Sequence, residues 1–175
     1  MTQLRTHCVI AALGDLNLDD EALKRLEIQN VNGVSLRGNP ITDKSLEHLA
    51  SLQYIDLSGT ECLGAELELL TKVRTVILDG TPVDDAAIAQ LVASNPVLSR
   101  LSLRKTQVTE ETLKTLAVYR TLMELELGDG EITADGLATT AFAPADRLTL
   151  NSMKFTGNVF ACGSPRAKTA NSVEI

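Results

Sequence analysis

Cysteine, histidine and acidic side chains are the groups in this sequence that could bind a metal or act in catalysis. The three cysteines, Cys8, Cys62 and Cys162, lie far apart, and only His7 and His48 could join them as ligands. A zinc site needs about four closely placed ligands, so we expect no metal and no cofactor. An odd number of scattered cysteines also argues against a disulfide framework, which favours a reducing, cytoplasmic location.

Two acidic pairs have the composition of an acid–base site: Asp19 with Asp20, and Asp84 with Asp85. Both pairs stand where a short helix is expected to begin. We therefore interpret them as helix caps, whose oxygens accept hydrogen bonds from unpaired backbone N–H groups. The sequence also lacks a glycine-rich phosphate loop and a Ser/His/Asp constellation. We expect a protein that is not an enzyme.

The composition limits the class of partner. The chain has 175 residues, of which 28 are leucine, and only 3% are aromatic, which favours one domain with an aliphatic core. Its net charge of −7 is unlike that of a nucleic-acid-binding protein. No stretch approaches the ~20 apolar residues of a membrane helix. The apolar run at residues 8–14 is short for a signal peptide and is interpreted as a strand. We expect neither nucleic acid nor a membrane as partner.

An internal repeat predicts the elements that position these residues. A segment of the form Leu-x-x-Leu-x-Leu recurs, and the last apolar residue of each copy follows the previous one after 21 to 25 residues. These anchors, which number the units from first to seventh, are Leu13, Leu36, Leu57, Leu78, Leu103, Leu127 and Leu150. Further apolar residues follow most anchors after five, ten and thirteen positions. The apolar residues at ten and thirteen positions after the anchor have the i, i+3 spacing of one face of a short helix.

Each unit therefore predicts a strand, a tight turn, a short helix and a return to the next strand. Neither element can bury its apolar face alone, whereas stacked units can form a parallel strand ladder over a continuous core. We expect a single domain over residues 1–162 and a flexible tail over 163–175. All three phenylalanines, Phe142, Phe155 and Phe160, are predicted to cover the C-terminal end of the core.

Segments such as residues 36–49 and 103–116 resemble leucine-rich repeats, and the match extends over about residues 8–155. The short period and the helix starts resemble the short bacterial or cysteine-containing subtype. The resemblance implies an α/β fold: a right-handed solenoid, or horseshoe, with a parallel β-sheet on the concave face and short helices on the convex face. It also implies a binding role, usually toward protein.

The position three residues after the anchor usually holds Asn or Cys in this family, where it satisfies buried backbone groups in the turn. Asn39, Thr60, Thr81 and Thr106 can do this here, because an amide or a hydroxyl forms such bonds. Leu16, Gly130 and Met153 cannot. We expect the ladder to be weakest at its two ends.

Side chains alternate along a strand, so the residues between the buried positions should face the concave side. The candidate partner-binding residues there are Arg37, Tyr54, Asp56, Ile77, Asp79, Arg100, Arg104, Glu124 and Glu126. Tyr54 and Ile77 place apolar surface beside charges that could fix a partner's orientation. In the alternative interpretation the charges only pair across neighbouring strands, Arg100 with Glu124 and Arg104 with Asp79.

The leading hypothesis is a non-catalytic interaction module that binds a protein or peptide on its concave face. One alternative is a structural, self-associating subunit. Only residues 1–7 precede the first strand, and a thinly covered sheet edge favours pairing into a homodimer. Another alternative is an adaptor or effector of the kind found among larger leucine-rich-repeat proteins, although no F-box-like helical segment precedes the repeats.

Overall fold

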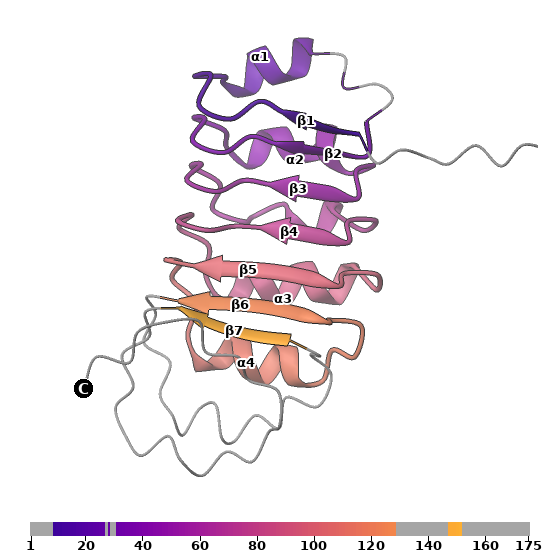
Figure 1. The fold of residues 1–175 in the computed structure, drawn as a ribbon, viewed down its shortest axis with the longest axis vertical. Coiled ribbons are helices and arrows are strands. Elements are labelled where there is room, and N and C mark those ends of the chain that lie inside the picture. Colours follow the sequence, from indigo (N-terminus) through magenta and orange to yellow (C-terminus); the bar gives the residue numbers. More distant parts are fainter. Residues whose placement is uncertain (1–8, 27, 29–30, 129–146, 152–175) are drawn as a thin grey trace, which may run out of the picture.

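Seven short parallel strands form one sheet in the computed structural model, which describes residues 9–26, 28, 31–128 and the backbone of 147–151. The strands lie side by side in chain order (Figure 1). They are Ile10–Ala12 (β1), Gly33–Ser35 (β2), Tyr54–Asp56 (β3), Thr75–Ile77 (β4), Arg100–Arg104 (β5), Glu124–Gly128 (β6) and Arg147–Asn151 (β7). Each strand pairs with the strand of the next unit, as the repeat predicts.

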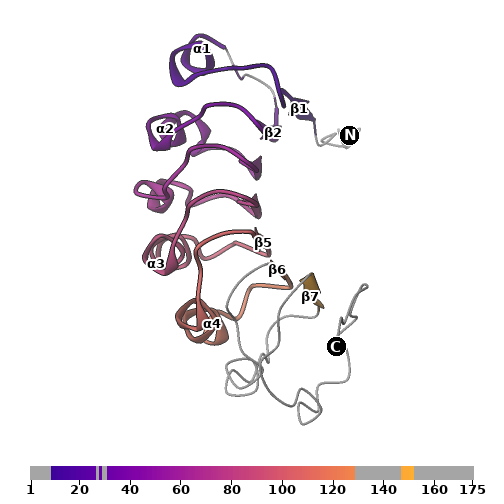
Figure 2. The same cartoon turned by 90° about the vertical axis from the view of Figure 1, so that its left-hand side faces the viewer.

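Short helices connect successive strands on the opposite side of the sheet. They are Asp20–Arg25 (α1), Asp43–Ser45 (η1) with Leu46–Leu49 (α2), Leu67–Leu69 (η2), Asp85–Ser94 (α3) and Glu110–Ala117 (α4). Figure 2 shows the sheet along the concave side of the stack and the helices along its convex side. The expected solenoid architecture is confirmed.

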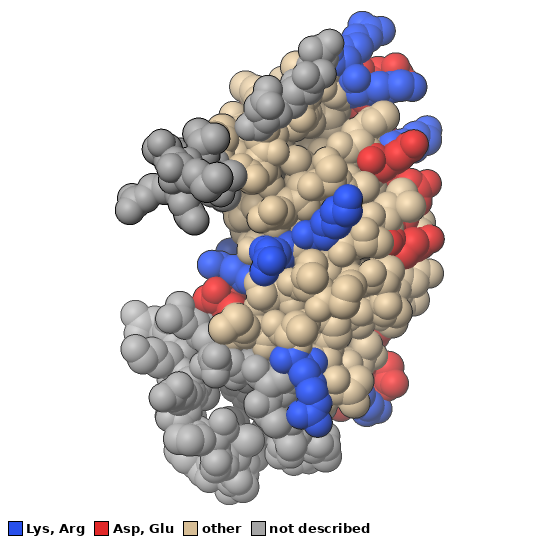
Figure 3. Space-filling view, turned by 90° about the vertical axis from the view of Figure 1, so that its right-hand side faces the viewer, with Lys and Arg blue, Asp and Glu red and all other residues tan. Residues whose placement is uncertain are grey.

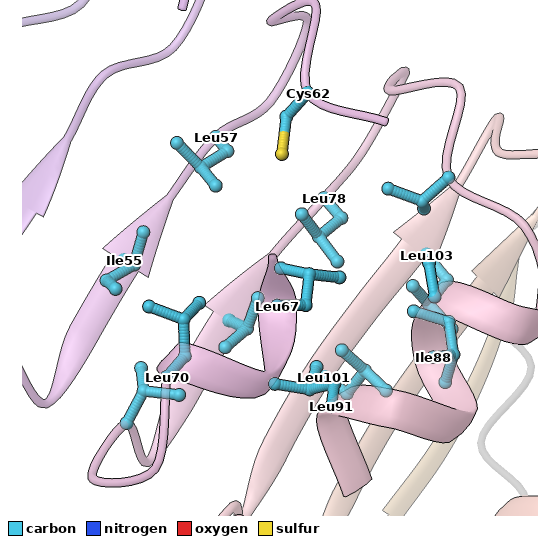
Figure 4. Close-up of a cluster of buried hydrophobic side chains, with 14 of the residues drawn as sticks. Ile55, Leu57, Cys62, Leu67, Leu70, Leu78, Ile88, Leu91, Leu101 and Leu103 are labelled. Carbon is cyan, nitrogen blue, oxygen red and sulfur yellow. The ribbon is translucent and has the colours of Figure 1, made fainter. Parts of the chain in front are cut away.

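The strand register matches the repeat alignment residue by residue. Val34, Ile55 and Val76 lie in one row across β2, β3 and β4, and all three are fully buried. The anchors Leu57, Leu78 and Leu103 form a second buried row (Figure 4). Leucine is abundant because every unit fills several such positions between sheet and helices.

Cys62 belongs to this core. It lies among the aliphatic side chains in Figure 4, at the repeat position that Ile41, Val83 and Val108 fill in other units. Burial and the neighbouring Asp43 carboxylate, which accepts a hydrogen bond from the thiol at 2.9 Å, raise the pKa of Cys62. Cys62 therefore acts as a small apolar residue, as its place in the repeat predicts.

One inward position was predicted wrongly. Leu26, expected on the buried stripe of the first helix, is 41% exposed. It is the C-cap of α1, where the backbone has already become extended. No earlier unit of the described chain covers it, so the helix stripe ends one position sooner than in the inner units.

The two acidic pairs at helix starts are caps, and their members divide the task. Asp19 and Asp84 cap their own helices by accepting hydrogen bonds from the backbone N–H groups of Ala22 and Ala87, at 2.7 and 2.9 Å. The residue after each of them, Asp20 or Asp85, reaches across to the next unit instead. Both members of each pair therefore accept hydrogen bonds that hold the repeat units together or cap their helices.

Asp20 ties the first unit to the second. Its carboxylate accepts hydrogen bonds from the N–H and Oγ1 of Thr42, at 2.9 and 2.6 Å, and from Oγ of Ser45 at 2.5 Å. Burial alone raises the pKa of Asp20, but these hydrogen bonds and the charge of Lys44 outweigh it, so the pKa lies below its ordinary value.

Asp85 ties the fourth unit to the fifth in the same way. It accepts hydrogen bonds from the backbone N–H and hydroxyl groups of Thr109 and Thr112, at 2.5 to 3.1 Å. These bonds again outweigh the effect of burial and lower the pKa of the carboxyl group. Asp43 plays the equivalent part between the second and third units, where it accepts from the N–H groups of Leu63 and Gly64.

The junction between the third and fourth units is built differently. Gly64 stands where the other units place the acidic tie, and a Cβ on it would lie 2.5 Å from Cβ of Ala87 on α3. At the far end of α3, the buried Asn95 side chain donates hydrogen bonds to the carbonyls of Leu70 and Val73, at 2.7 and 2.8 Å. Close apolar packing and an amide therefore replace the carboxylate.

The turn residues behave as the repeat predicts. Asn39 Oδ1 accepts hydrogen bonds from the N–H groups of Leu16 and Leu18, and its Nδ2 donates to the carbonyls of Leu13 and Leu36. The hydroxyls of Thr60, Thr81 and Thr106 each donate to the anchor carbonyl of their own unit. Asn39 thus joins two units, whereas each threonine closes one turn.

Several expectations concern residues outside the described part of the chain. These are the phenylalanine cover (Phe142, Phe155 and Phe160), the tail over 163–175, the boundary at 162, and the surroundings of His7, Cys8 and Cys162. They stay predictions.

The carboxylate ties predict an acid-sensitive stability. At pH 7 we expect Asp20→Asn and Asp85→Asn each to lower the free energy of unfolding by about 1–2 kcal/mol, because an amide cannot accept all these hydrogen bonds. Since the folded pKa of each carboxyl lies below its unfolded value of about 3.9, the stabilisation is present above that value and is lost as the pH falls through the folded pKa. Urea unfolding across this range measures the difference.

Glu68→Gln, on the exposed surface of η2, is the matched control and should change the stability little at any pH. A difference between wild type and the Asp variants that stays constant down to low pH would contradict the assignment of these carboxylates as charged ties.

Candidate functional site on the concave face

The concave face carries three rows of side chains, and the strand register places the predicted binding residues in them. One row contains Tyr54, Thr75, Arg100 and Glu124, and the next contains Asp56, Ile77, Ser102 and Glu126. The third row contains Arg37 and Asp79, which lie just beyond β2 and β4, and Arg104, the last residue of β5. The predicted residues therefore share one face.

Five residues form what we term the charged cluster: Asp79, Arg100, Arg104, Glu124 and Glu126. Arg104 contacts Oδ2 of Asp79 through Nη2 at 2.5 Å and through Nε at 2.7 Å. Nη1 of Arg100 lies 3.2 Å from Oε2 of Glu124. Both pairs expected from the sequence thus form, and the alternative interpretation of these charges is correct as far as contacts are concerned.

Glu126 joins the two pairs, which the sequence did not predict. Its Oε1 accepts a hydrogen bond from Nη2 of Arg100 at 2.6 Å, and its Oε2 lies 3.9 Å from Nε of Arg104. The side chains of Asp79 and Glu126 are only 14% exposed, whereas those of Arg100 and Arg104 are 42% and 43% exposed. The carboxylates therefore lie underneath, and the cluster presents mainly guanidinium groups to solvent.

Serine hydroxyls complete the acidic positions, and sequence reasoning did not single them out. Ser102 Oγ donates to Asp79 Oδ1 at 2.6 Å. Asp56 accepts from Ser35 Oγ at 2.9 Å and from Ser58 Oγ at 2.5 Å. These serines are neighbours of the carboxylates in the concave rows. The strand register could therefore have identified them as hydrogen-bond donors to Asp56 and Asp79.

Tyr54 packs closely against Gly33, its partner in the register on the neighbouring strand. A Cβ on Gly33 would lie 2.5 Å from Tyr54 Cβ, 2.7 Å from its carbonyl oxygen and 3.1 Å from Cδ1 of its ring. Only glycine at position 33 therefore allows the strand and the Tyr54 side chain to approach so closely. Burial, together with the charge of Asp56, raises the pKa of the Tyr54 phenol, while Arg100 opposes this.

The remaining predicted residues lie outside the cluster. Ile77 is half-buried in the row between Asp56 and Ser102. Arg37 is exposed, and its side chain makes no hydrogen bond or ion pair with the described residues. The face thus combines a positioned ring and an aliphatic side chain with an internally paired charged cluster.

The described residues contain neither a metal-binding cluster nor a membrane-spanning helix. No group of three or more His, Cys, Asp and Glu side chains is placed there to hold a metal ion. No helix in this part of the protein is long and apolar enough to cross a membrane.

Solved structures with the same arrangement decide the fold. Internalin C2 from Listeria monocytogenes str. 4b F2365 has 20% sequence identity and a TM-score of 0.54, over 91% of this chain and 80% of its own. A pollen receptor kinase 3 has 15% identity and a TM-score of 0.51, over 86% and 77%. Both are leucine-rich-repeat structures. The chain has the leucine-rich-repeat fold.

No protein-family model and no curated protein sequence matches the chain. At these identities, the likeness of this chain to solved structures shows its fold. A shared fold does not specify a ligand, which depends on the side chains at the surface.

Replacing Gly33 tests whether the glycine positions Tyr54. We expect Gly33→Ala to lower the free energy of unfolding by about 1–3 kcal/mol, because the new methyl group forces the ring or its strand to move. The displaced phenol should become more exposed, and its pKa should move back toward the ordinary value. NMR titration of ¹³C-labelled tyrosine follows this, with Tyr119 as an internal reference.

Gly14→Ala is the matched control, because a Cβ there meets its nearest atom, the carbonyl oxygen of Arg37, only at 3.4 Å. Equal effects of the two substitutions on the Tyr54 signal would show that Gly33 has no special part in placing the ring.

Proposed function

We propose that this protein is a non-catalytic module that binds a protein or peptide partner on its concave face. The observation that carries the proposal is the combination of the positioned Tyr54 ring with the outward guanidinium groups of Arg100 and Arg104. Tyrosine and arginine are the residue types that most often dominate binding energy at protein interfaces.

Pre-organisation supports this choice of face. Tyr54 is held in the space above Gly33, and the two arginines are held by carboxylates underneath. Binding therefore requires little ordering of side chains, which removes one of the main costs of association. Partner groups that suit this surface are apolar side chains over Tyr54 and Ile77, and carboxylate or carbonyl oxygens facing the arginines.

The groups that could act in catalysis have other tasks. Asp19, Asp20, Asp84 and Asp85 accept hydrogen bonds at helix starts. Cys62 is buried, with a raised pKa that disfavours the reactive thiolate. His48 is exposed on α2, on the convex side away from the concave face. These observations favour recognition over catalysis.

Affinity capture tests the concave face. The immobilised protein is incubated with lysate of its source cells, and captured proteins are quantified by mass spectrometry. We expect Tyr54→Ala/Ile77→Ala to reduce recovery of the specific partners about ten-fold or more, since two apolar anchors are removed. Leu63→Ala is the control, because Leu63 is 61% exposed but lies in the turn between β3 and η2, outside the strands that carry Tyr54 and Ile77.

Thermal unfolding of both variants verifies that each is folded. Undiminished capture by a folded Tyr54→Ala/Ile77→Ala variant would remove the concave face as the binding site.

Self-association through the first unit is the second candidate, because that unit exposes unusual apolar surface. Val9, Ile10, Leu16 and Leu26 are 41–57% exposed, and β1 is the edge strand of the sheet. The exposed charges of α1 are self-complementary, with Glu21 in the first turn and Lys24 and Arg25 in the last. Two antiparallel copies related by a two-fold axis would bring opposite charges together.

Light scattering over a range of concentrations tests this second candidate. We expect the measured mass to rise toward twice the 18.8 kDa of one chain, and Ile10→Lys to keep it monomeric, because a lysine on an edge strand opposes strand pairing. Leu63→Lys introduces the same charge elsewhere and should leave the dimer intact. A wild-type protein that stays monomeric at high concentration excludes the dimer.

A further inference from the structure

The loops that lead from α2, η2, α3 and α4 into the next strand form one edge of the solenoid with an unusual charge. We term it the basic rim; it comprises residues 50–53, 71–74, 95–99 and 118–123. Its charged residues are Lys72, Arg74 and Arg120, all of them cationic, although the chain carries a net charge of −7. Figure 3 views this side of the molecule: its middle is uncharged surface with scattered basic groups, and most acidic groups lie at its margins.

These three cations differ from the arginines of the charged cluster. Lys72, Arg74 and Arg120 are exposed, and none forms an ion pair with a carboxylate in the described part of the chain. The cause is geometric. The acidic caps and ties, such as Asp19, Asp43 and Asp84, stand at the opposite ends of the strands, where the helices begin. The rim therefore has positive charge that the carboxylates among residues 9–26, 28 and 31–128 do not neutralise.

Apolar side chains lie between the cations. Val97, Met123 and Val118 are 36%, 55% and 81% exposed, which places three of the nine large exposed apolar residues of the described chain on this rim. A shallow hollow between the third, fourth and fifth units is lined by Ser51, Gln53, Thr71, Lys72, Arg74 and Val97. The surface thus offers an apolar contact with cationic groups beside it.

The spacing of the units defines which ligand fits. Adjacent parallel strands lie ~4.8 Å apart. Lys72 and Val97 occupy the same repeat position in the loops that enter two adjacent strands, each two residues before the hydrogen-bonded backbones of Arg74 and Ser99. Arg74 and Met123, two units apart, are separated by ~10 Å. An extended peptide advances ~3.3 Å per residue. A segment crossing the units would therefore match the rim with a carboxylate followed by an apolar side chain about one to three residues later.

We propose that the basic rim is a second binding surface, which takes an acidic segment of a protein partner with interspersed apolar side chains. Charge complementarity carries this choice, because every charged group on the rim is a cation, and none of them pairs with a carboxylate in the described part of the chain. The site goes beyond the concave-face proposal and does not depend on it. The rim does not include Tyr54 or the charged cluster, although it borders them: Gln53, Ser99 and Met123 directly precede Tyr54, Arg100 and Glu124 in the chain.

Fluorescence anisotropy tests the rim with a labelled synthetic peptide of about twelve residues that repeats Glu-Glu-Leu. We expect saturable binding that weakens as salt is raised. Lys72→Glu/Arg74→Glu should weaken it about ten-fold or more, whereas Lys24→Glu/Lys44→Glu, which changes the net charge equally on exposed positions elsewhere, should weaken it less than about two-fold. Val97→Ser/Met123→Ser should also weaken binding, and circular dichroism verifies that each variant is folded.

Several outcomes would overturn the inference. If the two charge-reversal variants weakened peptide binding equally, the binding would depend on the net charge of the protein and not on the rim. A peptide with Gly in place of Leu that binds as tightly would remove the apolar contact, and a short oligonucleotide that binds as tightly would make the rim a general polyanion surface. If the protein self-associates and Lys72→Glu/Arg74→Glu abolishes this, the rim would bind the acidic edge of a second copy of the chain instead of a partner's segment. Tyr54→Ala should leave peptide binding unchanged, which keeps this test independent of the concave face.

Discussion

The contact between one unit and the next is the interaction on which the rest of this structure depends. A three-residue strand and a helix of one to three turns cannot bury an apolar face alone. Leu57, Leu78 and Leu103 become fully or almost fully buried only because neighbouring units lie on both sides of them. The hydrogen bonds of Asn39 and of the carboxylates of Asp20 and Asp85 then hold this stack in a single register. Every surface property follows from that register.

The concave face shows how a fixed register creates a surface with defined chemistry. Parallel strands place residues at the same repeat position side by side. Charged side chains at that position on adjacent units therefore either pair or repel each other. Arg100 and Arg104 each contact carboxylates of neighbouring units, and their guanidinium groups remain outermost. The less exposed carboxylates hold the arginine side chains in place, and the guanidinium groups face solvent. The protein therefore presents positioned positive groups here although its overall charge is negative.

Much of the fold could be predicted because the repeat encodes it many times. The anchors, the row assignments, the helix caps at Asp19 and Asp84 and the Arg104–Asp79 pair all follow from one aligned pattern. The predictions that failed or were missing depend on what differs between units. Leu26 is exposed because its unit is at the end of the stack. The contact of Tyr54 with Gly33 and the second contact of Arg100, with Glu126, depend on side-chain directions that spacing alone does not specify.

The junction between the third and fourth units has a consequence for how the stack responds to pH. The described junctions on either side of it contain a carboxylate tie at Asp43 or Asp85, whereas here Gly64 packs on Ala87 and the amide of Asn95 bridges the chain. The joint at Asp85 loses its charged acceptor as the pH falls through the lowered pKa of that carboxyl, whereas the ties between the third and fourth units are uncharged. Tyr54 and Ile77 lie on β3 and β4, so the apolar centre of the concave face spans a joint whose ties do not change charge with pH.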